Sequence, residues 1–170
     1  SADERQAFEN DGLVRLPGLI PEAAVRRARD SVLEALERLG LWKDGAWRLD
    51  AREKPRWPDS GVKASRDIGN RRSGVEALLN EPAILGVADQ LLEGRPFERR
   101  IYPRPQILFT LPNADRWFLP GHWHCDCPRL GSGRSPGVQM FACLDLVEPG
   151  GGGTVVVAGS HRLLNGAQFI

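Results

Sequence analysis

The carboxyl half of the chain contains the stretch that decides the fold, Val138-Gln-Met-Phe-Ala-Cys-Leu-Asp-Leu-Val147, followed by Glu148-Pro-Gly-Gly-Gly-Gly153 and Thr154-Val-Val-Val157. Apolar and β-branched runs on either side of a glycine-rich turn are typical of two successive strands. Gln106-Ile-Leu-Phe-Thr-Leu111, between two prolines, predicts an earlier strand, and the run from residue 122 to residue 126 predicts another. The second half of the chain is therefore expected to be a set of antiparallel strands.

The first half has a helical pattern instead. Pro21 stands at a helix start, Gly40 at its end, and the apolar residues between them fall at helical spacing: Val25, Ala28, Val32, Leu33, Leu36 and Leu39. A second helix is predicted from Pro82 to Leu92, and a short strand over residues 12–17. Residues 41–74 lack a clean period, so we expect a surface loop anchored by its tryptophans, with the wall of a pocket as the alternative.

Helices followed by antiparallel strands predict an α+β fold whose strands form a jelly-roll pair of sheets. We expect one domain over residues 1–170, with residues 1–100 mainly helical and residues 101–170 providing the first strands of the jelly-roll core.

The composition argues against several classes of function. The 170 residues have a formal net charge of +1, with 41% hydrophobic and 26% charged residues. A chain of this size can bury its own core, and its balanced charge gives no footprint for nucleic acid or a membrane surface. No apolar stretch has the length of a membrane span. Three cysteines do not make a disulfide framework, so we expect a reducing, cytoplasmic location.

The candidate chemistry lies in the run Pro120-Gly-His-Trp-His-Cys-Asp-Cys-Pro128. In an extended run, side chains alternate between two faces, which places His122, His124 and Asp126 on the same face. A histidine and a carboxylate two residues apart supply two ligands of the 2-His-1-carboxylate triad, which holds non-heme Fe(II) with open coordination positions. We predict that His124 and Asp126 bind a metal and that His122 borders their pocket.

The cysteines of this run leave a zinc site as an alternative. A structural zinc site usually takes its ligands from two separated pairs, and the chain has no second cysteine pair. Alternation also turns Cys125 and Cys127 away from His124, so we interpret them, with Cys143, as small buried apolar residues. Gln106 begins a strand expected beside the metal strand, where its amide either donates to a carboxylate ligand or is an ordinary core amide.

Three segments now stand in order: Gln106 in its strand, Trp123-His-Cys-Asp126, and Leu144-Asp145 followed by Gly151-Gly-Gly-Thr-Val-Val-Val-Ala-Gly-Ser-His161. Near the amino terminus, Phe8-x-x-Asp11-Gly12-x-Val14 precedes a helix. Together these segments resemble the phytanoyl-CoA dioxygenase family of Fe(II)/2-oxoglutarate oxygenases, over about residues 8–165. The glycine-rich turn, apolar strand and Gly-Ser-His are the most specific part of the resemblance.

The resemblance implies a double-stranded β-helix, a jelly-roll barrel with helices packed on its outside. It implies that His124 and Asp126 bind Fe(II), and that Gln106 and Phe141 line the 2-oxoglutarate pocket. Such enzymes decarboxylate 2-oxoglutarate to succinate and use O₂ to hydroxylate a substrate, here expected to be a small or lipid-like molecule. An aspartate at position 126 favours hydroxylation over halogenation, because related halogenases replace that ligand with a small residue.

The third ligand is where the sequence departs from the family pattern. In this family the histidine of Gly-Ser-His is generally not the ligand, and the distal histidine and the arginine that binds 2-oxoglutarate lie well beyond it. We therefore expect both after Ile170, with the barrel incomplete in these residues. Two alternatives stay open: His161 is the third ligand of a shortened site, or the chain is a non-catalytic jelly-roll module that binds a small molecule through an incomplete metal site.

Overall fold

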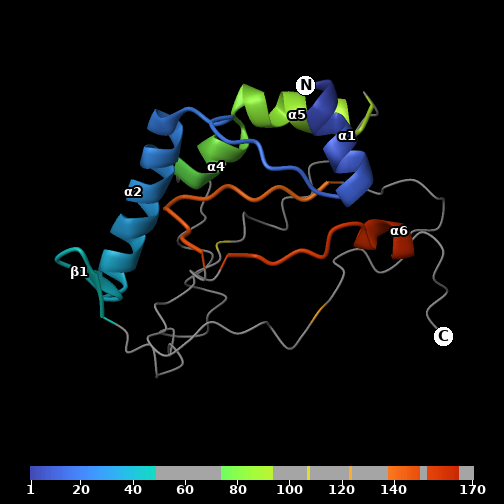
Figure 1. Ribbon diagram of the computed structural model, residues 1–170. Helices are drawn as coiled ribbons and strands as arrows, with labels where there is room; N and C mark the ends of the chain where they lie inside the picture. Colours follow the sequence, from blue (N-terminus) through green and yellow to red (C-terminus); the bar gives the residue numbers. More distant parts are fainter. Residues whose placement is uncertain (49–73, 94–106, 108–122, 124–137, 150–152, 165–170) are drawn as a thin grey trace.

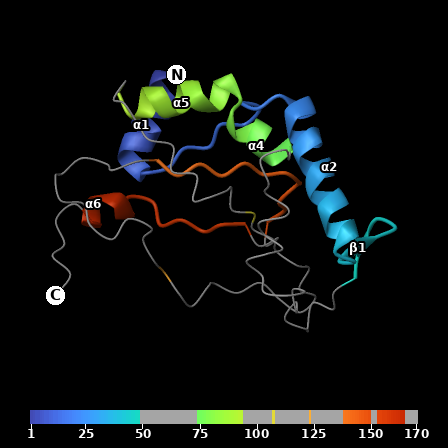
Figure 2. The ribbon, with the colours of Figure 1, turned by 180° about the vertical axis from the view of Figure 1, so that it is seen from behind.

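The computed structural model of the protein describes residues 1–48, 74–93, 107, 123, 138–149 and 153–164. Its elements in chain order are α1 (Ala2–Asp11), α2 (Glu22–Arg38), β1 (Trp42–Lys43), β2 (Ala46–Trp47), α4 (Gly74–Leu79), α5 (Pro82–Leu91) and α6 (Ser160–Leu164). Figure 1 shows α1, α4 and α5 along one side of two extended segments, residues 138–143 and 153–157; the first of them bends sharply at residues 144–145. The reverse view in Figure 2 places α2 at one end of this arrangement and α6 at the other.

Helix α2 forms where the apolar spacing predicts it. Pro21 is its N-cap, and its carboxyl end is closed by hydrogen bonds from the Gly40 amide to the Glu37 carbonyl and from the Leu41 amide to the Leu36 carbonyl, both at 2.9 Å. Gly40 has a φ of 70°, which this cap requires and which glycine adopts without strain. The predicted glycine stop is confirmed.

The buried face of α2 is narrower than its apolar pattern. It consists of Ala24, Ala28, Val32, Ala35 and Leu36, whereas Val25, Leu33 and Leu39 are only partly buried at its edges. The core cluster is completed by Leu41 and by Val75 and Leu78 of α4. Because most of the α2 residues in this face are small, a neighbouring helix can approach its backbone closely.

Helix α4 makes that approach through Gly74. A Cβ added at Gly74 would lie 2.5 Å from the Arg27 carbonyl oxygen and 2.9 Å from the Cα of Ala28. The Gly74 amide donates to Oγ of Ser31 at 3.1 Å, and that hydroxyl donates to the Ala28 carbonyl at 2.9 Å. Helix α5 follows directly, with Pro82 in its first turn as predicted, and buries Ile84 and Ala88.

Helix α1 is not predicted by apolar spacing, since none of its residues is buried. It begins instead with a capping box, in which the Ser1 hydroxyl accepts from the Glu4 amide and the Glu4 carboxylate accepts from the Ser1 amino group. Gly12 ends the helix with a φ of 75° and donates its amide to the Phe8 carbonyl at 2.8 Å. The strand expected over residues 12–17 is wrong, because residues 13–16 form no strand ladder.

Residues 42–47 form a two-stranded antiparallel hairpin where a surface loop is the prediction. Asp44, with a φ of 52°, and Gly45, with a φ of 76°, make the turn between β1 and β2. Trp42 pairs with Trp47 in the register, and their rings meet edge to face with centroids 5.4 Å apart. Both tryptophans pack against the core cluster, so the expected anchoring by tryptophan is confirmed for this pair. Trp57 lies outside the described residues.

Residues 138–143 are extended, and the chain bends at residues 144–145. Side chains over residues 138–145 alternate between half-buried and exposed, which is the burial period of a strand. Ala142 and Leu144 pack against the helical core. A Cβ on Gly153 would lie 3.1 Å from Cγ1 of Val147, so the chain has turned back on itself between these two residues. In the described residues, however, no backbone hydrogen bond joins the two extended segments, and the jelly roll stays a prediction.

Candidate functional site

The predicted metal ligands His124 and Asp126, and the predicted pocket residues His122 and Gln106, lie outside the described residues. Two of their sequence neighbours are described. Ile107 packs, partly buried, against the helical core, and the side chain of Trp123 is 52% exposed.

Phe141, the remaining predicted pocket residue, lies in the exposed row of the extended segment. Its side chain is 55% exposed, while Met140 and Ala142 on either side of it are half-buried. Because half-buried Ala142 and Leu144 pack on the helices, the side chains of Phe141 and Cys143 face away from them, whereas Asp145 lies at the bend over residues 144–145 and reaches α2. Cys143 belongs to the same exposed row as a free thiol, so the expectation that it is buried is wrong. Residues 138–147 contain more apolar side chains than the helices can cover, so some of them, including Cys143, are exposed.

The Gly-Ser-His motif, which ends the resemblance to the oxygenase family, contacts α1. The Nε2 of His161 lies 3.2 Å from the Glu9 carbonyl oxygen. Since a carbonyl only accepts, Nε2 carries the proton and donates. The other ring nitrogen, Nδ1, is buried with no partner among the described residues. The ring also occupies the place that a side chain at position 12 would take, because a Cβ added to Gly12 would lie 2.7 Å from Cγ of His161.

Sequence reasoning considered His161 only as a metal ligand, and the contact with α1 was missed. No local pattern signals it, because Glu9 and His161 are 152 positions apart. Gly12 is the only hint of this contact in the sequence. A glycine there predicts a tight turn at the end of a helix, but it does not indicate which side chain will cover that turn.

Asp145 stands at the start of the segment that ends in Gly-Ser-His, and its side chain joins the chain near residue 145 to α2. Its Oδ2 accepts from Nη2 of Arg29 at 3.1 Å and from Nε of Arg29 at 3.3 Å. The amide of Leu146 donates to Oδ1 at 3.0 Å. The hydrogen bond from the Leu146 amide, and with it the Arg29 guanidinium, holds the pKa of Asp145 below its usual range.

We expect Asp145→Asn to cost only about 0.5 kcal/mol at neutral pH, because the pair is exposed. A lowered pKa means that the folded protein binds this proton more weakly than the unfolded chain. The stabilising contribution is therefore present above the ordinary carboxyl pKa and disappears as the pH falls through the folded-state value. Urea titrations of the two proteins at a series of pH values should give stabilities that converge once the pH falls below the lowered pKa of Asp145. A difference in stability between the two proteins that persists in acid would contradict the view that the charge of Asp145, paired with Arg29, is its source.

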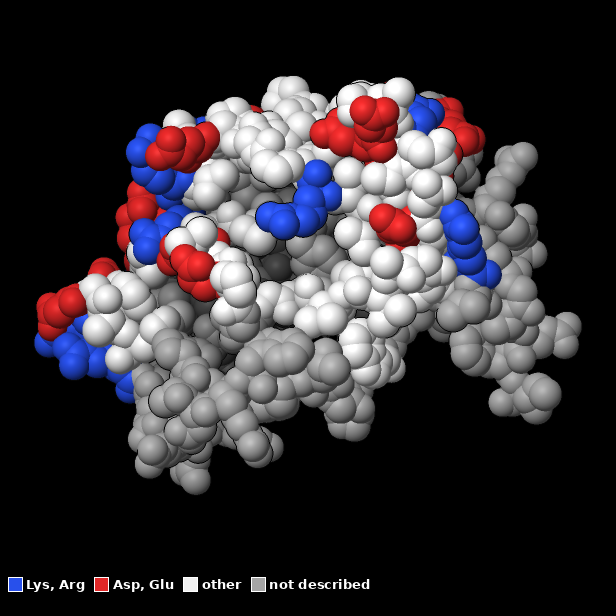
Figure 3. Space-filling model, viewed as in Figure 1, with Lys and Arg blue, Asp and Glu red and all other residues white. Residues whose placement is uncertain are grey.

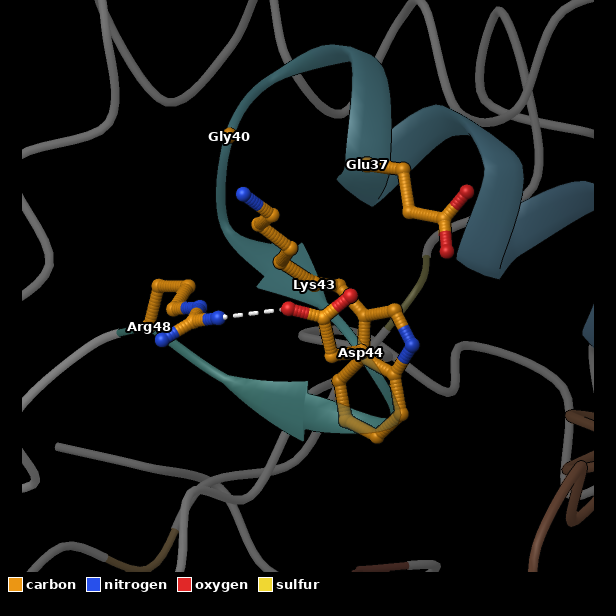
Figure 4. A pocket seen from close by; sticks show the side chains of 6 residues that line it. Glu37, Gly40, Lys43, Asp44 and Arg48 are labelled. Atoms are coloured by element: carbon orange, nitrogen blue, oxygen red, sulfur yellow. Dashed lines mark hydrogen bonds and ion pairs between the residues drawn. The ribbon is translucent and has the colours of Figure 1, made fainter.

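A surface hollow of about 480 Å³ lies between the end of α2 and the hairpin, lined by Glu37, Gly40, Trp42, Lys43, Asp44 and Arg48. Figure 4 shows the Asp44 carboxylate directed at Arg48, and their ion pair measures 3.0 Å. Phe141, the one predicted pocket residue that the structure describes, does not line this hollow. Its charged rim differs from the mostly apolar walls that are usual for small-molecule sites.

Charges of both signs are mixed on the described surface. On the face seen in Figure 3, the blue Lys and Arg side chains are interspersed with the red Asp and Glu side chains, and neither sign forms a field of its own among the described residues. No group of three potential metal-ligating side chains occurs in the described part of the chain. In that same part, no helix combines the length and apolar character needed to cross a bilayer.

Comparison of the chain with known protein families, with curated proteins and with solved structures found no match in any of the three.

Proposed function

We propose that the protein is an Fe(II)- and 2-oxoglutarate-dependent dioxygenase that hydroxylates a small or lipid-like molecule in the cytoplasm. The observation that carries the proposal is the order of its motifs: Gln106, then His124-x-Asp126, then the glycine-rich turn, apolar run and Gly-Ser-His. An imidazole and a carboxylate are the donors of the facial triad that holds non-heme iron. His124 and Asp126 are therefore the residues that would hold the metal.

The burial pattern of residues 138–145 supports the proposal. Helices pack on the outside of a double-stranded β-helix, so the face of a strand that turns away from them belongs to the interior of the barrel. The exposed row that contains Phe141 is such a face. In the strand predicted over residues 106–111, alternation would put Gln106 on the opposite face from Ile107, which packs on the helices. Phe141 and Gln106 would then contribute to the same pocket.

In this proposal each residue has a distinct role. His124 and Asp126 would hold the metal and would leave positions open for 2-oxoglutarate and O₂. Gln106 would line the 2-oxoglutarate pocket with its amide, and Phe141 would help to exclude water from it with its ring. When bound, the iron and 2-oxoglutarate supply the activation of O₂, with succinate and CO₂ as co-products and a hydroxyl group transferred to the substrate.

Anaerobic titration tests this proposal. We expect Fe(II) and 2-oxoglutarate together to give a weak visible charge-transfer band in protein expressed from the complete reading frame, because 2-oxoglutarate chelates the bound metal. Asp126→Ala should abolish the band by removing a ligand. Asp145→Ala is the matched control, since that exposed carboxylate is bound to Arg29 and should leave the band unchanged.

Two results would count against the proposal. A protein with both ligands intact that gives no band is not a dioxygenase of this type, and binding of 2-oxoglutarate without metal would favour the non-catalytic binding module. Zinc in the protein as purified, lost with Cys125→Ser and Cys127→Ser, would favour the structural zinc site.

A further inference from the structure

The carboxyl end of α1 is satisfied by residues from the other end of the described chain. The Gly159 amide donates to the Asp11 carbonyl at 2.7 Å. The Nη2 of Arg162 donates to the Glu9 carbonyl and to Oδ1 of Asn10, both at 3.2 Å. The last turn of α1 has no basic residue of its own. These contacts therefore supply both the donors and the positive charge that a helix carboxyl terminus favours.

Gly12 and His161 fit together at the centre of these contacts. The ring lies against the bare Cα of Gly12, where a Cβ would meet both Nδ1 and Cγ. Its Nε2 donates to the Glu9 carbonyl in the same turn. A glycine is thus required at position 12 for two separate reasons, the left-handed backbone and the space that the ring occupies.

The rest of α1 makes few packing contacts with the other described elements. None of its residues is buried, in contrast to the five buried residues of α2. Elsewhere along the helix, Ala7 and Phe8 are half-buried, and Nη2 of Arg5 donates a hydrogen bond of 3.5 Å to the Gln90 carbonyl at the end of α5. Segments with few buried apolar contacts open at a lower free energy than the core and do so as units.

We propose that Gly159–Arg162 is a latch and that α1 is a strap held closed by it. Releasing His161 lets α1 leave the molecule as one unit, while the core between α2 and α4 stays folded. This device is separate from the proposed dioxygenase chemistry and needs neither iron nor 2-oxoglutarate. It gives the histidine of Gly-Ser-His a defined task, the control of the position of the amino-terminal helix.

Hydrogen exchange in the intact protein tests the release. In His161→Ala we expect the amides of the last turn of α1 and of Gly12 to exchange roughly tenfold faster, the effect of losing one hydrogen bond to a helix end. Exposed Arg15, just after α1, should become a faster site of tryptic cleavage. Amide protection in α2 and α4 should not change. Arg26→Ala, at an exposed position of α2, is the control for loss of a surface polar residue.

A double-mutant cycle tests the fit between Gly12 and His161. Gly12→Ala should lower the urea midpoint markedly when His161 is present and much less when residue 161 is alanine, because the ring contact is then gone and only the cost of the positive φ remains. Gly18→Ala is the matched control. Gly18 has a φ of 72° with nothing within 4 Å of the added Cβ, so its effect should be the same in both backgrounds.

Three outcomes would overturn the latch. They are unchanged exchange of the α1 amides in His161→Ala, simple additivity of the Gly12 and His161 substitutions, and loss of protection throughout α2 and α4 when His161 is replaced. The last result would mean that α1 is part of the core rather than a separate strap. All three measurements are independent of the charge-transfer band, so the failure of the latch and the failure of the dioxygenase proposal are distinguishable.

Discussion

Replacing Leu36 by alanine is expected to lower the free energy of unfolding by about 2–5 kcal/mol. The side chain is 0% exposed and belongs to the core cluster that joins α2 to α4. Truncation removes its transfer free energy and leaves a cavity, because the small residues around it cannot collapse to fill the space. The neighbouring Leu78 of α4, which is 2% exposed, would line that cavity. Urea denaturation followed by far-ultraviolet circular dichroism measures the change.

Leu146→Ala makes the same chemical change at the surface and is the matched control. Leu146 is 80% exposed, so its truncation should alter the free energy of unfolding by less than about 0.5 kcal/mol. Equal effects at the two positions would show that the cluster around Leu36 is not the core of the folded protein.

Gly74→Ala is expected to cost about 1–3 kcal/mol, although alanine is the better helix former. The added Cβ would meet backbone atoms of α2, 2.5 Å from the Arg27 carbonyl oxygen and 2.7 Å from its carbon. Backbone cannot rotate away as a flexible side chain can, so α4 must move off α2. That movement would also stretch the hydrogen bond from the Gly74 amide to Ser31.

The same substitution at Gly86 should have the opposite sign. Gly86 lies within α5, with nothing within 4 Å of an added Cβ, so alanine there should stabilise the protein by about 1 kcal/mol through helix propensity. Urea midpoints of the two variants, measured side by side, separate the steric effect from the propensity effect. A rise in stability at both positions would contradict the close approach of α4 to α2.

The sequence predicts the elements whose stability comes from a periodic apolar face. Helix α2 has both the period and the Gly40 stop, and α5 has Pro82 in its first turn. Residues 138–143 are extended, as their apolar run predicts, although the alternating burial is not visible in that run because Phe141 and Cys143 are apolar and exposed. In the two helices, local pattern and tertiary burial agree, which makes them predictable from one sequence.

The elements that were missed have other causes. Helix α1 has no fully buried residue, so its signal in the sequence is the capping box of Ser1 and Glu4 rather than an apolar period. The hairpin is signalled by Asp44-Gly45, a strong turn dipeptide that the tryptophan-rich surroundings obscured. Helix α4 has only six residues, and its place depends on a close approach to α2 that no local pattern encodes.

The candidate site divides in the same way. The identities of His124 and Asp126 follow from ligand chemistry and spacing, which a sequence shows directly. The contact of His161 with the Glu9 carbonyl cannot be predicted in this way, because only the fold brings these two distant groups together. The role of Phe141 in a pocket stays a prediction; the helices show only that its side chain is turned away from them.

The contact between Glu9 and His161 also has a consequence for the order of events during synthesis. Glu9 precedes His161 by 152 residues, and ribosomes add about 5–20 residues per second. The carboxyl end of α1 therefore waits roughly 8–30 s after its own translation before its partners exist. During that interval the helix has its capping box, its Gly12 cap and, once residue 90 is made, the hydrogen bond from Arg5 to Gln90, and a ten-residue helix in isolation is marginal in water. The first of the described elements to leave the ribosome is thus the last to be secured.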